Sequence, residues 1–345
     1  MASSRHMARK WKVALLPGDG VGPELIENTT PILEAVNERF GISMDLSVGV
    51  AGFNAIEKYG TNLPEKTISL LKGSDCVLKG PMTTPEGGGS EISAAVKIRK
   101  MFSLYAGVRP SKNISGIKAV KPGVDLIIVR ENTEGMYSGL DFRVSEDTAM
   151  ALRVITRRAS ERIGKFALQL AKKRRRHLTI VHKGNILKES DSLFKESILR
   201  AAGGHSGVSI DEAHVDAMAQ WLIKKPESYD VIVTENLFGD ILSDEAAMIV
   251  GGVGVGPSAN IGAGYAMFEP VHGSAPKYTG KGIADPVATI LSEAMMYEWM
   301  GIEAAGSAIR KGVEAAISKG VKTRDLGGRS STSGMCKYIA KRISK

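Results

Sequence analysis

The chain contains little cysteine. Its 345 residues include two, Cys76 and Cys336, which lie far apart in the sequence and carry no metal-ligand spacing. This scarcity predicts a reducing compartment and excludes a cysteine-based zinc site.

Long apolar runs are also absent. No run approaches the roughly 20 residues of a membrane-spanning helix, and no secretory apolar segment lies near the start. Both absences predict a cytoplasmic protein without a membrane partner. The first residues, M-A-S-S-R-H, have the composition of an expression-vector tag, so residues 1–6 are left out of the fold prediction.

The glycine fingerprint of dinucleotide-binding folds is incomplete. A strand-like run at residues 12–16 precedes P-G-D-G-V-G-P-E, but Pro23 stands where a fingerprint counted from Gly18 needs its last glycine. The string therefore does not predict a Rossmann fold. Pro23 instead suits the first turn of a helix predicted from Glu24 to about Phe40. The apolar positions of this helix recur at helical spacing: Leu25, Ile26, Ile32, Leu33 and Val36.

Apolar segments along the chain predict alternating strands and helices. The strand-like runs are residues 12–16, 76–79, 125–130, 178–182 and 231–234, with helical patterns between them. This alternation predicts an α/β fold with an at least partly parallel sheet. Residues 136–152 are less regular and predict an arm or hairpin. The glycine-rich residues 251–264 predict a long loop.

The chain is basic, with a formal net charge of +9 at pH 7. Such a balance suits either nucleic acid or an anionic substrate and cofactor. The densest cluster, K-K-R-R-R at residues 172–176, ends an amphipathic helix predicted from about Thr156, where cations complement the helix C-terminus. No aromatic-rich ribonucleoprotein motif accompanies it, so the pattern favours a solvated helix end over a nucleic-acid site.

The segment N-L-F-G-D-I-L-S-D at residues 236–244 places two carboxylates four residues apart. If a helix begins at Gly239, Asp240 and Asp244 share one helix face. Hard oxygen ligands at this spacing suit Mg²⁺ or Mn²⁺, which take one or two carboxylates together with substrate and water. The alternative is an N-cap aspartate followed by a solvated carboxylate in the first turn.

Three arginines, Arg99, Arg109 and Arg130, are each predicted beside a strand or turn boundary. Taken singly, each is more typical of a surface ion pair. Together with the two aspartates they suit a substrate with several carboxylates that is chelated to a divalent ion. Tyr137 and Lys183 are residue types that serve as an acid and a base, with an ordinary phenol and a surface amine as the alternatives.

Seven motifs, in this order, span almost the whole chain: G-D-G-V-G-P-E, K-G-P-M-T-T-P, L-Y-A-G-V-R-P, R-E-N-T-E-G-M-Y, H-K-G-N-I, N-L-F-G-D-I-L-S-D and E-P-V-H-G-S-A-P. On these motifs the chain resembles the isocitrate/3-isopropylmalate dehydrogenase family of metal-dependent β-decarboxylating dehydrogenases. The resemblance implies a two-lobed fold rather than a Rossmann fold. It implies a large domain with the cofactor site, residues 8–104 and 251–345, and a small domain with the dimer interface and the arm, residues 105–250.

The same resemblance implies a reaction: oxidative decarboxylation of isocitrate to 2-oxoglutarate and CO₂ with reduction of NADP, as in the tricarboxylic acid cycle. The implied steps are removal of the substrate's hydroxyl proton by Lys183 to give a metal-bound alkoxide, hydride transfer to NADP, loss of CO₂, and protonation of the resulting enolate by Tyr137. The implied substrate ligands are Ser93, Arg99, Arg109, Arg130 and Asn185. The implied metal ligands are Asp216, Asp240 and Asp244. Lys183 and Asp216 would come from the neighbouring subunit, so the resemblance implies an obligate homodimer.

The choice of nucleotide depends on H-G-S-A-P-K-Y. NAD enzymes of the family usually carry an aspartate and an apolar residue where this chain has Lys277 and Tyr278, a pair that donates to a 2′-phosphate. NADP is therefore favoured over NAD, and Arg324 and Arg329 add positive charge. Asp285 replaces the usual asparagine. The implied nucleotide ligands are Thr84, Glu269, His272, Gly273, Ser274, Ala275, Lys277, Tyr278, Asp285 and Arg324.

The choice of substrate depends on S-A-A-V-K-I-R. Isocitrate enzymes generally show S-x-N before the first arginine; this chain keeps Ser93 but has Ala95 in place of the asparagine. Isocitrate is the first choice, and homoisocitrate or 3-isopropylmalate is the alternative within the family. A non-catalytic regulatory subunit and an RNA-binding role through residues 172–176 remain as remote alternatives.

Overall fold

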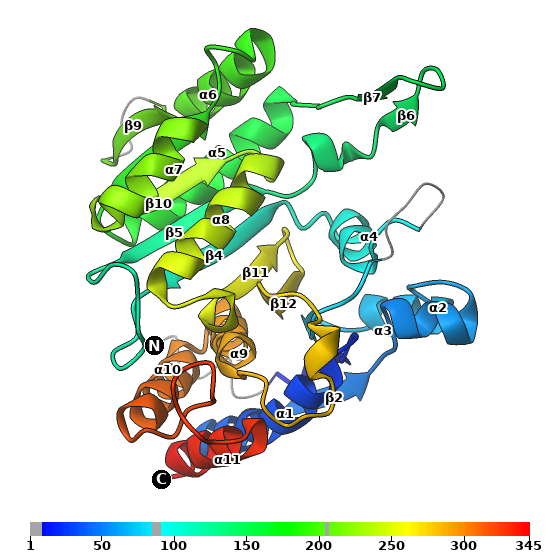
Figure 1. Ribbon diagram of the computed structural model, residues 1–345, viewed down its shortest axis with the longest axis vertical. Coiled ribbons are helices and arrows are strands. Elements are labelled where there is room, and N and C mark those ends of the chain that lie inside the picture. The colour runs from blue at the N-terminus through cyan, green and yellow to red at the C-terminus, as the bar shows by residue number, and fades with distance from the viewer. Residues whose placement is uncertain (1–8, 85–90, 204–206) are drawn as a thin grey trace.

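A mixed β-sheet organises the computed structural model, which describes residues 9–84, 91–203 and 207–345 (Figure 1). Within these residues the sheet has ten strands in the order β2-β1-β3-β12-β11-β4-β5-β10-β8-β9. Their bounds are β1 Trp11–Leu16, β2 Met44–Val48, β3 Cys76–Lys79, β4 Ala106–Lys112, β5 Asp125–Glu131, β8 His177–His182, β9 Ser209–His214, β10 Val231–Thr234, β11 Pro257–Ile261 and β12 Ala266–Pro270. The predicted tag at residues 1–6 lies outside the described residues.

Most neighbouring strands are parallel, which confirms the predicted α/β class. The exceptions are in the middle of the sheet, where β4 pairs antiparallel with β5 and β11, and β11 pairs antiparallel with β12. The long loop predicted over residues 251–264 is wrong, because Pro257–Ile261 forms β11 after a 3₁₀ turn at Val253–Val255. Hydropathy did not mark this strand, since its Ser258 and Asn260 are buried although polar.

Helices connect the strands and cover both faces of the sheet. Their bounds are α1 Gly22–Phe40, α2 Phe53–Tyr59, α3 Glu65–Lys72, α4 Ala94–Met101, α5 Arg157–Lys172, α6 Lys188–Ala202, α7 Val215–Lys224, α8 Asn236–Val250, α9 Val287–Trp299, α10 Glu303–Ser318 and α11 Thr332–Ile343. The first helix confirms its prediction, with Pro23 in the first turn and the predicted apolar positions buried. Helix α5 is capped by Thr156, whose hydroxyl accepts from the Ala159 N–H at 3.2 Å, close to the predicted start.

One face of the sheet carries a continuous apolar core, and the other face carries two separate cores. The continuous core packs α1, α5, α9, α10 and α11 against the strands. On the opposite face, Leu126 and Ile128 pack with α7 and α8. Val77 and Met267 pack with α3 and α4 in the second core of that face. The strand residues between these two cores are charged or polar, so the apolar surface on this face of the sheet is interrupted there.

A two-stranded hairpin projects from the body of the molecule (Figure 1). It is formed by β6, Asp141–Arg143, and β7, Ala149–Ala151, which confirms the hairpin predicted within residues 136–152. Its apolar side chains are unusually exposed: Leu140, Phe142, Val144, Met150 and Leu152. The division into domains 8–104 with 251–345 and 105–250 stays a prediction. In the described part of the chain, no helix is long and apolar enough to cross a membrane.

Candidate active site

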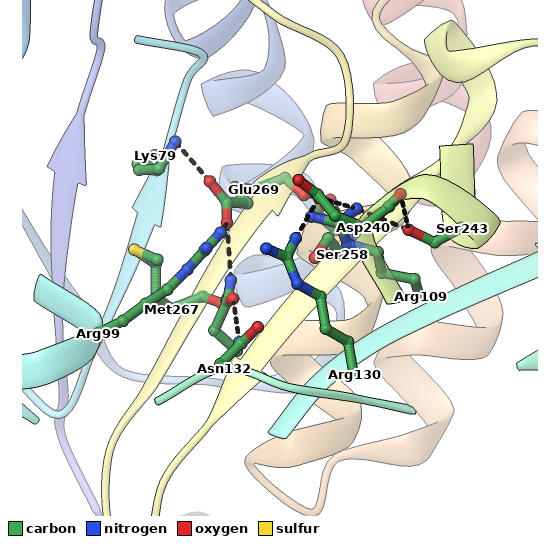
Figure 2. A network of polar contacts seen from close by, with 12 residues as sticks. Lys79, Arg99, Arg109, Arg130, Asn132, Asp240, Ser243, Ser258, Met267 and Glu269 are labelled. Atoms are coloured by element: carbon green, nitrogen blue, oxygen red, sulfur yellow. Dashed lines mark hydrogen bonds and ion pairs between the residues drawn. The ribbon is translucent and has the colours of Figure 1, made fainter. Parts of the chain in front are cut away.

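Successive side chains along a strand lie on opposite faces of the sheet, and on the face with two cores this places charged side chains between those cores. On β5, Ile128 belongs to the core with α8, so Arg130 faces the same side. On β12, Met267 belongs to the core with α4, and Glu269 follows it on that side. Strand β4 contributes Arg109 to the same place (Figure 2). The sheet therefore gathers residues that are far apart in the sequence.

Arg130 is 1% exposed and is fixed by residues of α8. Its Nε and Nη2 atoms donate to Oδ1 of Asn236 at 2.9 and 2.7 Å. Its Nη1 atom forms an ion pair with Asp240 (Figure 2). Gly239 lets the helix approach so closely, since a Cβ there would lie 2.7 Å from Cγ of Arg130. Burial and the nearby Arg109 lower the pKa of Arg130 to about 10, so it stays charged at neutral pH.

The predicted helix face at residues 240–244 is confirmed, although the helix begins earlier than the start at Gly239 that was assumed for it. Helix α8 begins at Asn236 rather than Gly239, because Glu235 caps it by accepting from the backbone N–H of Phe238 at 2.8 Å. Asp240 lies inside the helix, so the alternative of an N-cap aspartate is wrong.

Asp240 is the centre of a hydrogen-bond cluster. Its Oδ1 atom accepts from Nη1 of Arg109 at 3.0 Å and pairs with Arg130, while its Oδ2 atom accepts from the Tyr137 hydroxyl at 2.5 Å. Burial opposes ionisation of Asp240, but the Arg130 and Arg109 guanidiniums outweigh it and hold the pKa of its carboxyl below the usual range. The structure thus brings together Arg109, Arg130, Tyr137 and Asp240, as the sequence predicted.

Asp244 lies one turn further along α8 and is more accessible. Its side chain is 57% exposed and accepts from Nη1 of Arg109 at 3.4 Å, and burial of the carboxyl raises its pKa. Two aspartate carboxylates on one helix face are a donor set that fits Mg²⁺ or Mn²⁺. Over residues 9–84, 91–203 and 207–345, no three His, Cys, Asp or Glu side chains come together as a metal cluster. A complete ligand set would therefore need a group from elsewhere.

A second network surrounds Glu269 on β12. Its carboxylate forms ion pairs with Lys79 Nζ at 2.5 Å and Arg99 Nη2 at 2.9 Å (Figure 2). It also accepts from the Asn260 side-chain amide at 2.7 Å, and Oδ1 of Asn260 accepts from Asn132 at 2.8 Å. Burial opposes ionisation, but Lys79 and Arg99 hold the pKa of Glu269 far below its usual range. Sequence reasoning missed Lys79, Asn132 and Asn260.

Replacing Lys79 with methionine will destabilise the protein by about 3 kcal/mol at pH 7, because it removes one cation from a buried ion pair and leaves the Glu269 charge undercompensated. The folded-state pKa of Glu269 is depressed, so this stabilisation is present above its unfolded pKa. The difference from wild type should shrink as the pH falls below about 4. Urea unfolding at several pH values measures it. Lys112→Met, in an exposed pair with Asp125, is the control and should have little effect.

Two of the three predicted arginines occupy positions other than those expected. Arg99 lies inside α4 and Arg109 lies in the middle of β4, rather than beside strand or turn boundaries. Arg130, close to the end of β5, agrees with the prediction. The three side chains nevertheless approach one region, since Arg99 pairs with Glu269 and Arg109 with Asp240.

A small cavity of about 180 Å³ lies between the two networks. Its walls include Arg99 and Arg109, together with the predicted substrate-contacting Ser93 and the neighbouring Ala95. Lys79 and Glu269 line the same cavity, so three cationic side chains face it together with one carboxylate, which pairs with Lys79 and Arg99. This lining suits a small ligand with several carboxylates.

A larger cavity of about 710 Å³ adjoins the first, and the two share His272 and Gly273 in their walls. Its lining includes four further residues predicted to bind the nucleotide: Ala275, Tyr278, Asp285 and Arg324. Burial lowers the pKa of His272, which favours the neutral ring at pH 7. Burial and the nearby Asp325 raise the pKa of Asp285 well above its usual range.

Asp19 connects its own loop to two others beside these cavities. Its carboxylate accepts from the backbone N–H groups of Phe53 and Thr83, each at 2.8 Å. The Thr83 hydroxyl lies 2.6 Å from the hydroxyl of Ser274, a predicted nucleotide ligand. Thr84, another predicted ligand, follows directly and is exposed. Asp19 of the G-D-G motif is therefore a positioning residue for this edge, which the sequence did not indicate.

Lys183 and Asp216 form a separate pair outside both networks. The Lys183 Nζ atom lies 2.5 Å from Oδ1 of Asp216. This hydrogen bond holds the pKa of the Asp216 carboxyl below its usual range. The predicted substrate ligand Asn185 is exposed beside them. Among the described residues, neither side chain of the pair contacts Arg130 or Asp240. The structure therefore does not bring these three predicted site residues to the main cluster within one chain.

Known proteins are similar to this chain over nearly its whole length. A model of the isocitrate/isopropylmalate dehydrogenase family matches residues 12–340. The 3-isopropylmalate/3-methylmalate dehydrogenase of Methanocaldococcus jannaschii is 41% identical over 337 residues, covering 96% of this chain and 98% of that protein. The homoisocitrate dehydrogenase of the same organism is 42% identical over 347 residues, covering 97% of this chain and 98% of that protein. The crystal structure of isocitrate dehydrogenase from Methylococcus capsulatus has a TM-score of 0.92 at 40% identity, covering 97% of this chain and 100% of that one.

Proposed function

We propose, from the premise that this chain belongs to the isocitrate/isopropylmalate dehydrogenase family, that it oxidatively decarboxylates isocitrate to 2-oxoglutarate and CO₂ with NADP as hydride acceptor. The family is one of dehydrogenases that generally use a divalent metal and NAD(P), and its fold agrees with the predicted one. Substrate and nucleotide identity are the proposed parts.

The observation that carries the substrate proposal is the lining of the small cavity. Arg99, Arg109 and Lys79 place three cations around about 180 Å³, against the single carboxylate of Glu269 that pairs with Lys79 and Arg99, and this excess of positive charge suits a substrate with several carboxylates. An isopropyl group in the same cavity would meet Met82, Ala95 and Val271, but Ser93 and the charged side chains of the same lining reduce what it gains from apolar contact. This lining favours isocitrate over 3-isopropylmalate.

The proposed metal ligands are Asp240 and Asp244 of one subunit and Asp216 of a second copy. A divalent cation held there would polarise the hydroxyl and carboxylate of the substrate. Arg109 and Arg130 hold Asp240 ionised and in place, so the carboxylate is ready for a cation at neutral pH.

Tyr137 is the proposed proton donor. Burial and the hydrogen bond to Asp240 raise the pKa of its hydroxyl, so the phenol keeps its proton at neutral pH. The Arg130 guanidinium lies over its ring at 4.8 Å from the centroid and fixes the ring's position. Lys183 is the proposed base, and Asn185 its neighbouring amide, both acting in the site of the other subunit.

The proposal requires a homodimer with shared sites. Two features support it. The Lys183–Asp216 pair lies apart from the main cluster of its own chain and could complete the site of a second copy, and the exposed apolar side chains of the hairpin, Phe142 and Met150, could be buried against that copy. Two buried free thiols, Cys76 and Cys336, fit a reducing cytoplasm.

A mixture of two inactive variants tests the shared site. Arg130→Lys and Lys183→Met should each be inactive, whereas co-expression of both chains should restore roughly a quarter of the wild-type activity. Half of the dimers are mixed by chance, and each of these has one intact site. If Lys183 acted within its own chain, the mixture would stay inactive.

Homoisocitrate is the second candidate substrate. Ala95 removes an amide expected in isocitrate enzymes, and this extra space suits a longer acid. Relatives named for homoisocitrate and isopropylmalate support this alternative about as well as the isocitrate relative supports the first.

The deciding experiment is to follow NADP and NAD reduction by the purified protein with Mg²⁺ and each of the three acids. Fast NADPH production with isocitrate supports both specificity proposals. A higher kcat/KM with homoisocitrate or 3-isopropylmalate would overturn the substrate proposal and leave the family assignment intact.

A further inference from the structure

The mouth of the larger cavity carries an exposed tyrosine between two lysines. Tyr278 lines the cavity and is 41% exposed. The Lys277 Nζ atom lies 5.0 Å from the centroid of its ring, and the Lys281 Nζ atom lies 5.9 Å from the same centroid. Both ammonium groups are within cation–π distance of the ring. Lys281 is not part of the K-Y pair from which the nucleotide was predicted.

The turn that carries Lys281 is held in place. Its backbone N–H donates to the carbonyl of Tyr278 at 3.2 Å, and the N–H of Gly282 donates to Oε2 of Glu24 at 3.1 Å. Directly after this turn, Ile283 lines the cavity again. The backbone therefore keeps Lys281 beside the cavity mouth.

The cations at this mouth are not neutralised by the protein. Over the described ranges, the side chains of Lys277, Lys281 and Arg324 form no ion pair with an acidic side chain. Two acidic residues, Asp285 and Asp325, line the cavity; burial and the nearby Asp325 raise the pKa of Asp285 well above its usual range, and Asp325 accepts from the hydroxyl of Thr323 at 2.6 Å. An excess of unpaired positive charge at a cavity mouth favours a ligand with negative charge at that end.

We propose that Lys281 is a further specificity-determining residue, which together with Lys277 binds the 2′-phosphate of the nucleotide. The proposal rests on the proposed use of NADP and adds a residue to it. A 2′-phosphate carries nearly two negative charges, whereas the 2′-hydroxyl of NAD carries none. Two ammonium groups flanking Tyr278 therefore distinguish the nucleotides by charge.

The test measures binding of two small probes, without substrate or turnover. The probe 2′,5′-ADP has the phosphate in question and 5′-AMP lacks it. Lys281→Met should weaken 2′,5′-ADP about tenfold by isothermal titration calorimetry, the loss expected for one charge-assisted contact, and should leave 5′-AMP unchanged. The dependence of 2′,5′-ADP binding on salt should also become less steep.

Lys58→Met is the matched control. Its Nζ atom lies 5.4 Å from the ring centroid of Tyr59, a similar lysine–tyrosine arrangement outside the cavity lining. This variant should bind both probes as the wild type does. Thermal unfolding of both variants checks that neither substitution disturbs the fold.

Each of the other possible outcomes contradicts one part of the proposal. If the wild type prefers 2′,5′-ADP and Lys281→Met binds it equally well, Lys281 has no role and the use of NADP stands. If Lys281→Met weakens both probes alike, its effect is general electrostatics and the specificity role is wrong. If the wild type does not prefer 2′,5′-ADP over 5′-AMP, the NADP part of the proposed function fails first.

Discussion

Replacing Arg130 with lysine will lower kcat/KM by about a thousandfold, although the positive charge is kept. The guanidinium makes several contacts at once: Nε and Nη2 donate to Asn236, and Nη1 pairs with Asp240. A lysine ammonium is a point charge and cannot reproduce this fork. Asp240 and the Tyr137 ring would lose the partner that orients them.

The loss should appear in kcat/KM with any of the candidate acids, because the proposed role of Arg130 concerns the part of the substrate that all candidate acids have in common. Arg310→Lys is the control. Arg310 makes a comparable two-point pair with Glu298 at 2.8 and 3.0 Å, but it lines neither of the two cavities of the site. Activity of Arg130→Lys within tenfold of wild type would contradict the proposed role of the fork.

Asp240→Asn will lower kcat/KM by about a thousandfold or more and will raise the Mg²⁺ concentration needed for half-maximal activity. The carboxylate is held ionised by Arg109 and Arg130, and the amide carries no charge to attract a cation. The Tyr137 hydroxyl would also lose its charged acceptor. Binding of Mn²⁺ followed by electron paramagnetic resonance gives a second measurement that does not need turnover.

Glu245→Gln is the control for this prediction, because Glu245 follows on the same helix and its removal also takes away one negative charge. It should keep both activity and Mn²⁺ affinity. Circular dichroism and urea unfolding establish that Asp240→Asn remains folded at the assay temperature. Wild-type activity of folded Asp240→Asn at limiting Mg²⁺ would refute the metal assignment.

Local patterns in the sequence were sufficient for the α/β class and for several elements. Periodicity placed α1 with its buried face, and it placed β3 and β10 at their observed bounds. The spacing of Asp240 and Asp244 correctly placed both on one helix. These features depend on neighbours within a few residues along the chain, which is why the sequence alone reveals them.

The middle of the sheet was not predictable in the same way. Strand β11 carries Ser258 and Asn260 at buried positions. The side-chain amide of Asn260 donates to the Met267 carbonyl and to Glu269 on β12, and the backbone N–H of Ser258 donates to the Ser292 hydroxyl of α9. A hydropathy pattern therefore suggests a loop. Only pairing with β4 and β12 makes this segment a strand.

The sequence by itself determined which residue types the chain has for the chemistry: arginines, paired aspartates, a tyrosine and a lysine in motifs of one family. The tertiary structure decided which of them meet. Lys79 and Glu269 are distant in sequence, yet adjacent parallel strands β3 and β12 bring their side chains to 2.5 Å. Gly239 allows Arg130 to lie beneath α8. Such contacts depend on strand order and close helix approach, which are set by packing across the whole sheet rather than by local spacing.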